Sequence, residues 1–386
     1  MFKIQTLNNI AAVGLKQFQP DLYEVSSTIS DPDAILVRSH DMHTMKIPST
    51  VKVIGRAGSG VNNIPVHEMT KAGIPVLNTV GANANAVREL VIAGMLLACR
   101  NICSAWEYVQ QLKSESMEKQ IEENKKKFAG FELMGKTLGV IGLGSIGVKV
   151  ANSAMNLGMS VIGYDPTITV NRAWELSSGV SQAKHLDDLL KHSDFITLHV
   201  PLNSETKNLI DAAKLAVMKN TVVLLNFARD GIIDNAALKD ALEKKKLSWY
   251  VTDFPTASLK DHPHVISLPH LGASTKEAED NCAVMIVKQV KEFLERGNII
   301  SAVNFPTIEM PKNLDSCRIA IVNENVPNIV AQISSKLADH GFNIISLLNG
   351  SKETIAYTLI DVNKKVSDNL LSEISKIKGI IHSRRV

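Results

Sequence analysis

Three spaced glycines are the first residues of this chain whose pattern points to chemistry. The motif Gly142-x-Gly144-x-x-Gly147 follows an apolar run, Leu138 to Ile141, and leads into helix-compatible sequence. In such a strand, turn and helix, the first glycine allows the tight turn and the second lets backbone N–H groups approach a pyrophosphate. The third lets the helix pack closely on the strand. The helix N-terminus adds free N–H donors for an anion, so the motif predicts a dinucleotide site.

Asp165 ends the next predicted strand, about 20 residues after the glycines, where a dinucleotide site places an acid. A carboxylate there accepts a hydrogen bond from a ribose 2′-hydroxyl and repels a 2′-phosphate, which favours NAD over NADP. An Asp before Pro166 is also a common turn starter. The two interpretations are compatible.

Three polar side chains follow later predicted strands, namely Arg229, Asp253 and His270. The carboxyl ends of parallel strands meet at one edge of a sheet, so we expect them near the nicotinamide. Histidine changes protonation near neutral pH and can take a hydroxyl proton while the carbon loses a hydride. Arginine can hold a neighbouring carboxylate through two hydrogen bonds. The pair predicts oxidation of a 2-hydroxy acid, with a purely structural histidine as the alternative.

Polar clusters also end the short apolar runs near the start of the chain, at Arg38-Ser39, at 56–59 and at 78–85. They are candidates for a substrate rim, although each one alone is more typical of a loop. Arg38 and, more weakly, Arg56 have no acid beside them in sequence. Their charge predicts a further anion on the substrate, such as a phosphate. A structural salt bridge is the alternative for each arginine.

The elements that would position these residues alternate between strand and helix, which predicts parallel sheets. A first α/β unit ends at about Arg88, and a buried helix over 89–103 crosses to a doubly wound nucleotide unit. A helix over 276–296 returns the chain to the first unit, and a linker rich in Pro and Asn spans 304–313.

The tail over 317–386 reads strand, helix, strand, strand, helix, strand, the split βαβ arrangement. The predicted fold is therefore α/β, with two Rossmann-like doubly wound parallel-sheet domains and a C-terminal βαββαβ, ferredoxin-like domain. The expected boundaries are 1–90 with 276–305 for the substrate-binding domain, 91–275 for the NAD-binding domain and 316–386 for the C-terminal domain.

Composition narrows the class of protein. The chain has 386 residues, 45% hydrophobic and 21% charged, with a net charge of +3, so it can bury sizeable cores and gives no reason to expect nucleic acid. The charged run over 113–127 reads as a solvated helix face. No apolar run is long enough to span a bilayer and no signal peptide is evident, so cytoplasm is the default expectation. The four cysteines are scattered, which predicts buried free thiols and no metal site.

Six motifs together resemble the D-isomer-specific 2-hydroxyacid dehydrogenases, over the whole length of the chain. They are Leu36-Val-Arg38-Ser39, Arg56-Ala-Gly-Ser-Gly-Val-Asn-Asn63, Gly142-Leu-Gly-Ser-Ile-Gly147, His199-Val-Pro-Leu-Asn-Ser-Glu-Thr206, Asn226-Phe-Ala-Arg229 and Pro269-His-Leu-Gly-Ala-Ser-Thr275. The tail is similar to an ACT domain, an amino-acid-sensing module. Within the family, the resemblance is to members that oxidise 3-phospho-D-glycerate to 3-phosphooxypyruvate with NAD, the first step of L-serine synthesis by the phosphorylated route.

The resemblance implies roles for particular residues. The implied catalytic residues are Arg229, which also holds the carboxylate, and His270, the acid–base. The implied substrate residues are Arg38, Ser39, Arg56, Gly58, Asn83 and Arg229. The implied NAD-binding residues are Gly142, Gly144, Ser145, Ile146, Gly147, Asp165, Val200, Pro201, Thr206, Phe227, Ala228, Arg229, Asp253, His270 and Gly272. The implied effector residues of the tail, for L-serine, are Asn323, Asn325 and Asn343. Side-by-side pairing of ACT domains implies a homo-oligomer, a dimer or tetramer.

One departure concerns the histidine. The family pairs it with a Glu, and here Ala257 lies near the expected position. Either Asp253 or another carboxylate orients His270, or the histidine works unpaired. The missing Glu lends weight to one other function, a non-catalytic protein that senses NAD(H), which the retained Arg229 and His270 argue against. A glycerate or hydroxypyruvate reductase is a separate alternative, and Arg38-Ser39 and the ACT-like tail count against it.

Overall fold

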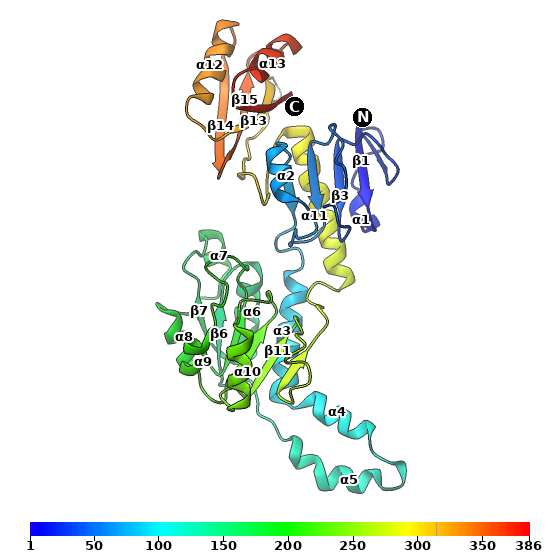
Figure 1. Cartoon of the computed structure of the whole chain (residues 1–386), viewed down its shortest axis with the longest axis vertical. Helices are drawn as coiled ribbons and strands as arrows, with labels where there is room; N and C mark the ends of the chain where they lie inside the picture. The colour runs from blue at the N-terminus through cyan, green and yellow to red at the C-terminus, as the bar shows by residue number, and fades with distance from the viewer. Residues whose placement is uncertain (314) are drawn as a thin grey trace. The chain divides into compact units, whose positions relative to one another are not determined.

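The computed structural model describes residues 1–313 and 315–386 and comprises two compact units (Figure 1). Unit 1 contains Met1–Ala82 and Lys276–Val386, and unit 2 contains Asn83–Thr275. The chain thus leaves unit 1 once and returns to it. Because the C-terminal tail groups with the N-terminal sheet, this division differs from the three predicted domains, whose boundaries stay a prediction.

Unit 1 begins with a parallel five-stranded sheet in the order β2-β1-β3-β4-β5. Short apolar runs form its strands, and all four side chains of β3 are buried. The elements are β1 (Phe2–Leu7), α1 (Ala12–Leu15), β2 (Tyr23–Ser26), β3 (Ala34–Val37), β4 (Val53–Arg56), α2 (Val66–Lys71), β5 (Val76–Asn78) and α11 (Lys276–Arg296).

Helix α11 lies along this sheet (Figure 1) and has the bounds predicted from the sequence. Its buried side is a stripe of apolar residues that includes Ile286, Val290 and Phe293. Two glycines allow the close approach. A Cβ on Gly55 of β4 would lie 2.8 Å from Ile286 Cγ1, and one on Gly14 of α1 would lie 2.5 Å from the carbonyl carbon of Ala283. The helix is therefore tightly packed against its neighbours.

The C-terminal module of unit 1, residues 315–386, folds as an antiparallel four-stranded sheet in the order β14-β15-β13-β16. Two helices accompany it, and the βαββαβ order confirms the prediction. The elements are β13 (Cys317–Glu324), α12 (Ile329–Asp339), β14 (Ile344–Lys352), β15 (Ile355–Val362), α13 (Asp368–Ser375) and β16 (Ile380–Arg385).

A buried ion pair joins two strands of the module. Arg318 of β13 donates two hydrogen bonds to the carboxylate of Asp361 on β15, of 2.7 and 2.8 Å, and both side chains are almost fully buried. The remaining donors of Arg318 reach the carbonyls of Arg296, Met310 and Pro311. The guanidinium is thus satisfied on all sides, as a buried charge requires.

Unit 2 contains a seven-stranded parallel sheet in the order β12-β11-β10-β9-β6-β7-β8, which confirms the doubly wound prediction. Its strands are β6 (Thr137–Ile141), β7 (Ser160–Tyr164), β8 (Ser181–Gln182), β9 (Phe195–Leu198), β10 (Val223–Asn226), β11 (Trp249–Thr252) and β12 (Val265–Ser267). Its helices are α3 (Ala84–Cys99), α4 (Ile102–Gln110), α5 (Met117–Asn124), α6 (Ser145–Asn156), α7 (Val170–Glu175), α8 (Leu186–His192), α9 (Ala212–Val217), α10 (Asn235–Glu243) and the 3-10 turns η1 (Ser114–Ser116) and η2 (Lys125–Phe128).

Two sequence expectations need correction in unit 2. The helix predicted over 89–103 ends at Cys99, and α4 starts a new direction after Asn101, which adopts a left-handed conformation with φ of 51°. Asparagine tolerates this conformation better than most residues, and the sequence pattern does not show it. Cys103 is exposed on α4, whereas Cys99 and Cys282 are buried as predicted and Cys317 is half-buried.

In the described part of the chain, no helix has the length and apolar character needed to cross a membrane. Within the same residues, His, Cys, Asp and Glu side chains form no group of three or more suited to a metal ion.

We predict that Asp361→Asn destabilises the protein by about 3–5 kcal/mol, because it leaves the buried Arg318 charge without its counter-charge. Urea unfolding monitored by circular dichroism would measure the loss. The matched control is Asp368→Asn, which removes the exposed partner of Arg385 and should cost less than about 1 kcal/mol. Equal unfolding midpoints for the two variants would contradict the prediction.

Candidate active site

The glycine-rich turn lies at the carboxyl end of β6, next to β9 and at the point where the order of strands reverses. Gly142 has φ of 90°, and a Cβ there would lie 2.6 Å from the carbonyl oxygen of His199. A Cβ on Gly147 would lie 1.9 Å from the carbonyl oxygen of Gly142. The fold of the chain itself therefore requires these two glycines.

Gly144 is different, because a Cβ built on it would meet no atom of the described chain within 4 Å. Its φ of −74° is also one that any residue adopts. Gly144 is the N-cap of α6, and no side chain caps that helix end. The open space and the free N–H donors fit the pyrophosphate of a dinucleotide, with Ser145 and Ile146 in the first turn beside it.

Asp165 follows β7 and bonds the glycine-rich turn. One carboxylate oxygen accepts a hydrogen bond from the backbone N–H of Leu143 at 2.8 Å, and the other accepts one from the backbone N–H of Thr167 at 2.8 Å. The second bond is the turn expected from an Asp before a proline. The hydrogen bond from Leu143 places the carboxylate beside the glycine-rich turn. A hydrogen bond between this carboxylate and a ribose stays a prediction.

Asn226, at the end of β10, shapes the loop that carries Arg229. Its side chain is buried, donates to the carbonyl of Arg229 at 2.9 Å and accepts from the backbone N–H of Ala228 at 3.1 Å. Arg229 is half-buried and bonds the carbonyl of Ala228. The loop is therefore held by the strand behind it, and the guanidinium keeps donors for an anion.

Asp253, which directly follows β11, holds the loop that carries His270 by hydrogen bonds to its backbone. Its buried carboxylate accepts hydrogen bonds from the backbone N–H groups of Leu271 at 2.6 Å and Gly272 at 2.8 Å. The backbone N–H of His270 also bonds the carbonyl of Asp253 at 3.1 Å. Both oxygens serve the backbone, so Asp253 does not orient the imidazole in this structure.

His270 is exposed and has φ of 56°, a left-handed conformation that is uncommon for a residue other than glycine. Its ring lies against that of Phe254, with the centroids 4.9 Å apart. Among the residues that the structure describes, no carboxylate bonds this ring. Of the alternatives left by the missing Glu, the structure favours a histidine that is positioned by its backbone and by Phe254.

Arg38 forms a salt bridge, the alternative that the sequence analysis left open for it, and its role in phosphate binding stays a prediction. It follows β3, and its Nη2 lies 2.7 Å from Oε1 of Glu279, a residue 241 positions later on α11. The pair raises the pKa of the arginine and lowers the pKa of the glutamate, because each charge stabilises the other. Both side chains are about two-fifths exposed, at 36% and 42%, so the pair contributes little to stability.

The other predicted substrate residues lie in two units. Ser39 is exposed beside Arg38 in unit 1, and Arg56 donates from Nε to the carbonyl of Arg38 at 3.1 Å. Gly58 has φ of 152°, and a Cβ there would lie 1.8 Å from Nη1 of Arg56, so glycine makes room for that guanidinium. Asn83 belongs to unit 2, as the N-cap of α3.

Thr206 folds the loop that follows β9. Its hydroxyl donates to the carbonyl of Pro201, and its backbone N–H bonds Asn203. The remaining predicted NAD residues follow the strands β9, β10 and β12 and are Val200, Phe227, Ala228 and Gly272. Their contacts with NAD stay a prediction.

The predicted effector residues lie in the C-terminal module. Asn325 follows β13 and donates from its side chain to the carbonyl of Glu353 at 3.0 Å, and the backbone N–H of Asn343 bonds the side chain of Asn363. Asn323 is buried, and its Oδ1 has no partner among the described residues. A role in effector binding stays a prediction.

His199, directly after β9, is a residue that the sequence analysis did not single out. One ring nitrogen lies 3.0 Å from the hydroxyl of Thr197, while the buried Nδ1 has no partner among the described residues. Burial lowers the pKa of His199 to about 3, so the ring is neutral at physiological pH. His199 opens one of the six motifs named above, and that position is the sequence signal that could have drawn attention to it.

This depressed pKa predicts a specific pH dependence of stability. Unfolded His199 takes up a proton below about pH 6.5, whereas the folded ring does not until about pH 3, so stability is full above 6.5 and falls with pH between these values. From about pH 7 to 5 the histidine should remove up to about 2 kcal/mol. His199→Asn should lose this part of the slope in urea unfolding measured at both pH values. His192→Asn, on the exposed face of α8, should keep it.

Comparison with known proteins identifies the family. Residues 92–272 match a family model described as the D-isomer specific 2-hydroxyacid dehydrogenase, NAD binding domain. This match confirms the NAD-binding prediction. A solved structure of NAD⁺-bound 3-phosphoglycerate dehydrogenase from Entamoeba histolytica is similar to this chain, with a TM-score of 0.61 and 27% identity, covering 78% of this chain and 98% of that one.

Two relatives are similar over most of the chain. A D-3-phosphoglycerate dehydrogenase from Methanocaldococcus jannaschii is 39% identical across 80% of this chain, which spans 59% of that protein. One from Bacillus subtilis is 32% identical across 100% of this chain and 76% of its own length. The chain belongs to the D-isomer specific 2-hydroxyacid dehydrogenase family.

Proposed function

We propose that this protein oxidises 3-phospho-D-glycerate at C2 to 3-phosphooxypyruvate with NAD. The observation that carries the proposal is the pair of loops after β10 and β12, which present Arg229 and His270 at the carboxyl edge of an NAD-binding sheet. The names of the relatives support the choice of substrate.

Gly144, Ser145 and Asp165 would hold NAD, which would supply the acceptor for the hydride from C2. Arg229 holds the substrate carboxylate through its guanidinium and favours the carbonyl that forms beside it. His270 takes the proton from the C2 hydroxyl oxygen and returns it in the reverse reaction. The side chain rests against Phe254, so the ring is held by packing and by its loop.

The substrate phosphate is assigned to Arg38, with Ser39, Arg56, Gly58 and Asn83 as further contacts. This assignment separates the proposal from a glycerate or hydroxypyruvate reductase, whose substrate lacks the phosphate. It also separates the proposal from a non-catalytic NAD(H) sensor, which would show no turnover and would need neither Arg38 nor His270.

The decisive experiment follows NADH absorbance with the purified protein and phosphooxypyruvate, against hydroxypyruvate, 2-oxoglutarate and an NADPH control. We expect turnover with phosphooxypyruvate and NADH. His270→Gln should lower kcat by about 10²–10⁴-fold while NADH fluorescence still reports binding. Arg38→Gln should raise KM for phosphooxypyruvate by about tenfold and leave KM for hydroxypyruvate unchanged.

Three results would overturn parts of the proposal. Equal kcat/KM for phosphooxypyruvate and hydroxypyruvate would favour the reductase, and NADH binding without turnover would favour the sensor. An unchanged kcat in His270→Gln would remove the acid–base role. Addition of L-serine in the same assay tests the predicted effector residues, since inhibition lost in Asn343→Ala would assign that site.

We also propose a homo-oligomer that forms through the edge of the C-terminal sheet. Strand β14 pairs only with β15 in the described chain, and it exposes Ile345, Leu347 and Leu348. An unprotected apolar edge strand is a template for pairing with a second chain. A second copy would add its own β14 to this edge.

Leu347→Lys should therefore yield a smaller species in light scattering after gel filtration, because a charge on an edge strand opposes pairing. Val170→Lys is the matched control, since Val170 is 72% exposed on α7, outside the module. If both variants keep the mass of the original protein, the edge of β14 is not the interface.

A further inference from the structure

We propose that a pocket on one face of the N-terminal sheet binds a small organic cation, namely an aromatic ring that carries a short alkylammonium tail. All residues that line the pocket belong to unit 1, and its volume is about 700 Å³. Ligand sites in proteins have volumes of about 300–1,000 Å³, so the pocket is large enough for such a molecule. The proposal goes beyond the proposed reaction and does not depend on it.

The pocket lies where a crossover helix is missing. Neighbouring parallel strands are usually joined by a helix that covers the sheet, as α2 does between β4 and β5. Residues 38–52, all of which the structure describes, join β3 to β4 without a helix. An irregular segment over 45–48 lies there instead, and its Met45 and Ile47 pack against the buried core of the sheet. This thin cover leaves space between the segment and α2.

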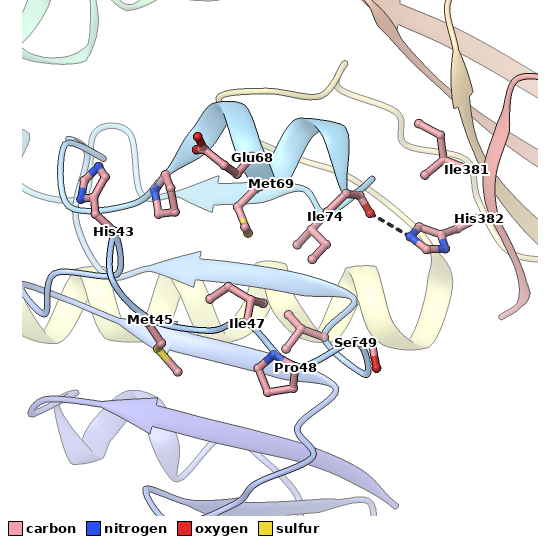
Figure 2. A pocket seen from close by; sticks show the side chains of 13 residues that line it. His43, Met45, Ile47, Pro48, Ser49, Glu68, Met69, Ile74, Ile381 and His382 are labelled. Atoms are coloured by element: carbon pink, nitrogen blue, oxygen red, sulfur yellow. Dashed lines mark hydrogen bonds between the residues drawn. The ribbon is translucent and has the colours of Figure 1, made fainter.

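Three parts of unit 1 form the walls of the pocket (Figure 2). The segment over 43–51 supplies one wall, α2 and the residues after it supply the second, and Ile381 and His382 of β16 lie at one end. Most of the lining side chains are apolar, among them Met69 and Ile74. A ligand's apolar surface would be removed from water there, which supplies most of the affinity.

Hydrogen bonds and close packing hold these walls in place. Nε2 of His382 donates to the carbonyl of Ala72 at 2.8 Å (Figure 2), and a Cβ on Gly73 would lie 2.8 Å from Cδ2 of the same histidine. The C-terminal module is therefore seated tightly at this end. On the other wall, the backbone N–H of Val51 bonds the carbonyl of Pro48 at 3.1 Å. The pocket is thus preformed, and a ligand need not reorganise it.

The lining side chains suit a flat ring. Met45 and Met69 bring one thioether to each of the two long walls, and thioethers make favourable contacts with aromatic rings. Pro48 and Pro65 also line the pocket, whereas no Phe, Tyr or Trp does so among the described residues. Methionine side chains adapt their shape to a neighbour. An aromatic body therefore gains more from these walls than an aliphatic chain of the same area.

The charges around the pocket select a cation. The lining residues include one carboxylate, that of Glu68, and no lysine or arginine in the described part of the chain. His43 also lines the pocket, and its ring bonds the carboxylate of Asp41. Both acids are exposed, so they lie where the pocket meets solvent. Because the whole chain has a net charge of +3, this negative rim is a local feature, and it attracts an ammonium group.

The test measures the binding of three indoles to the full chain by saturation-transfer NMR. Tryptamine carries an ammonium group, tryptophol a hydroxyl and indole-3-propionate a carboxylate on the same ring. NADH is present at saturation, so the ring cannot occupy the adenine part of the NAD site. We expect the Kd of tryptamine to be about threefold below that of tryptophol, with indole-3-propionate the weakest. Equal Kd values, no binding of any indole, or release of tryptamine by NADH would overturn the proposal.

Ala72→Phe tests the location of the site. Ala72 lines the pocket and has a helical backbone conformation that phenylalanine also adopts, so the new ring takes the space of the ligand's ring. We expect the Kd of tryptamine to rise by about tenfold or more, a loss of about 1.4 kcal/mol. The matched control is Ala12→Phe, at an exposed position of α1 outside the pocket, which should leave the Kd unchanged. An unchanged Kd in Ala72→Phe would overturn the location.

Glu68→Gln tests the charge and keeps the shape of the pocket, so it also serves if Ala72→Phe does not fold. We expect the Kd of tryptamine to rise by about threefold and that of tryptophol to stay unchanged. Glu24→Gln, an exposed acid on β2, should change neither value. An unchanged Kd of tryptamine in Glu68→Gln would overturn the selection of a cation. A lower molecular mass of Ala72→Phe in light scattering would overturn the ligand, because a second copy of the chain would then fill the pocket.

Discussion

The whole site depends on one constraint, the need of loop backbone groups for hydrogen bonds where parallel strands end. Buried polar side chains supply these hydrogen bonds. Asn226 folds the loop behind Arg229, and Asp253 bonds two N–H groups of the loop behind His270. Since Asn226 ends β10 and Asp253 directly follows β11, the positions of the two loops follow from the packing of the sheet. The chemistry is thereby tied to the stability of unit 2.

The same constraint accounts for the way His270 is held, with no carboxylate bonding its ring among the described residues. A carboxylate partner would fix both the orientation of the ring and its proton. Here the left-handed backbone of His270, its N–H bond to Asp253 and the ring of Phe254 fix the orientation. The cost of the unusual backbone conformation, about 1–3 kcal/mol, is offset by the buried bonds that Asp253 makes. Positioning by backbone and packing replaces positioning by charge.

Local patterns were sufficient to predict most of the elements and the doubly wound order of the sheet, whereas the site at its carboxyl edge stays a prediction. The period of the apolar residues set the bounds of α11, and the glycine spacing located the turn after β6. Such local patterns do not show contacts between residues that lie far apart in the sequence. No acid stands directly beside Arg38 in the sequence, and its partner Glu279 lies 241 residues later. The break at Asn101 was missed for another reason, since one left-handed residue leaves the helical pattern on both sides intact.

The missed contacts share a physical character, and this is why α11 matters. Arg38 with Glu279, Arg318 with Asp361 and Arg384 with the carbonyls of α11 are charged groups that meet across long stretches of sequence. Burial decides what each contributes. Loss of either partner of the buried Arg318 pair would leave an unpaired buried charge, whereas the half-exposed Arg38 pair contributes little to stability. Helix α11 therefore contacts buried side chains of the C-terminal module at its last turn and a half-exposed arginine at its first.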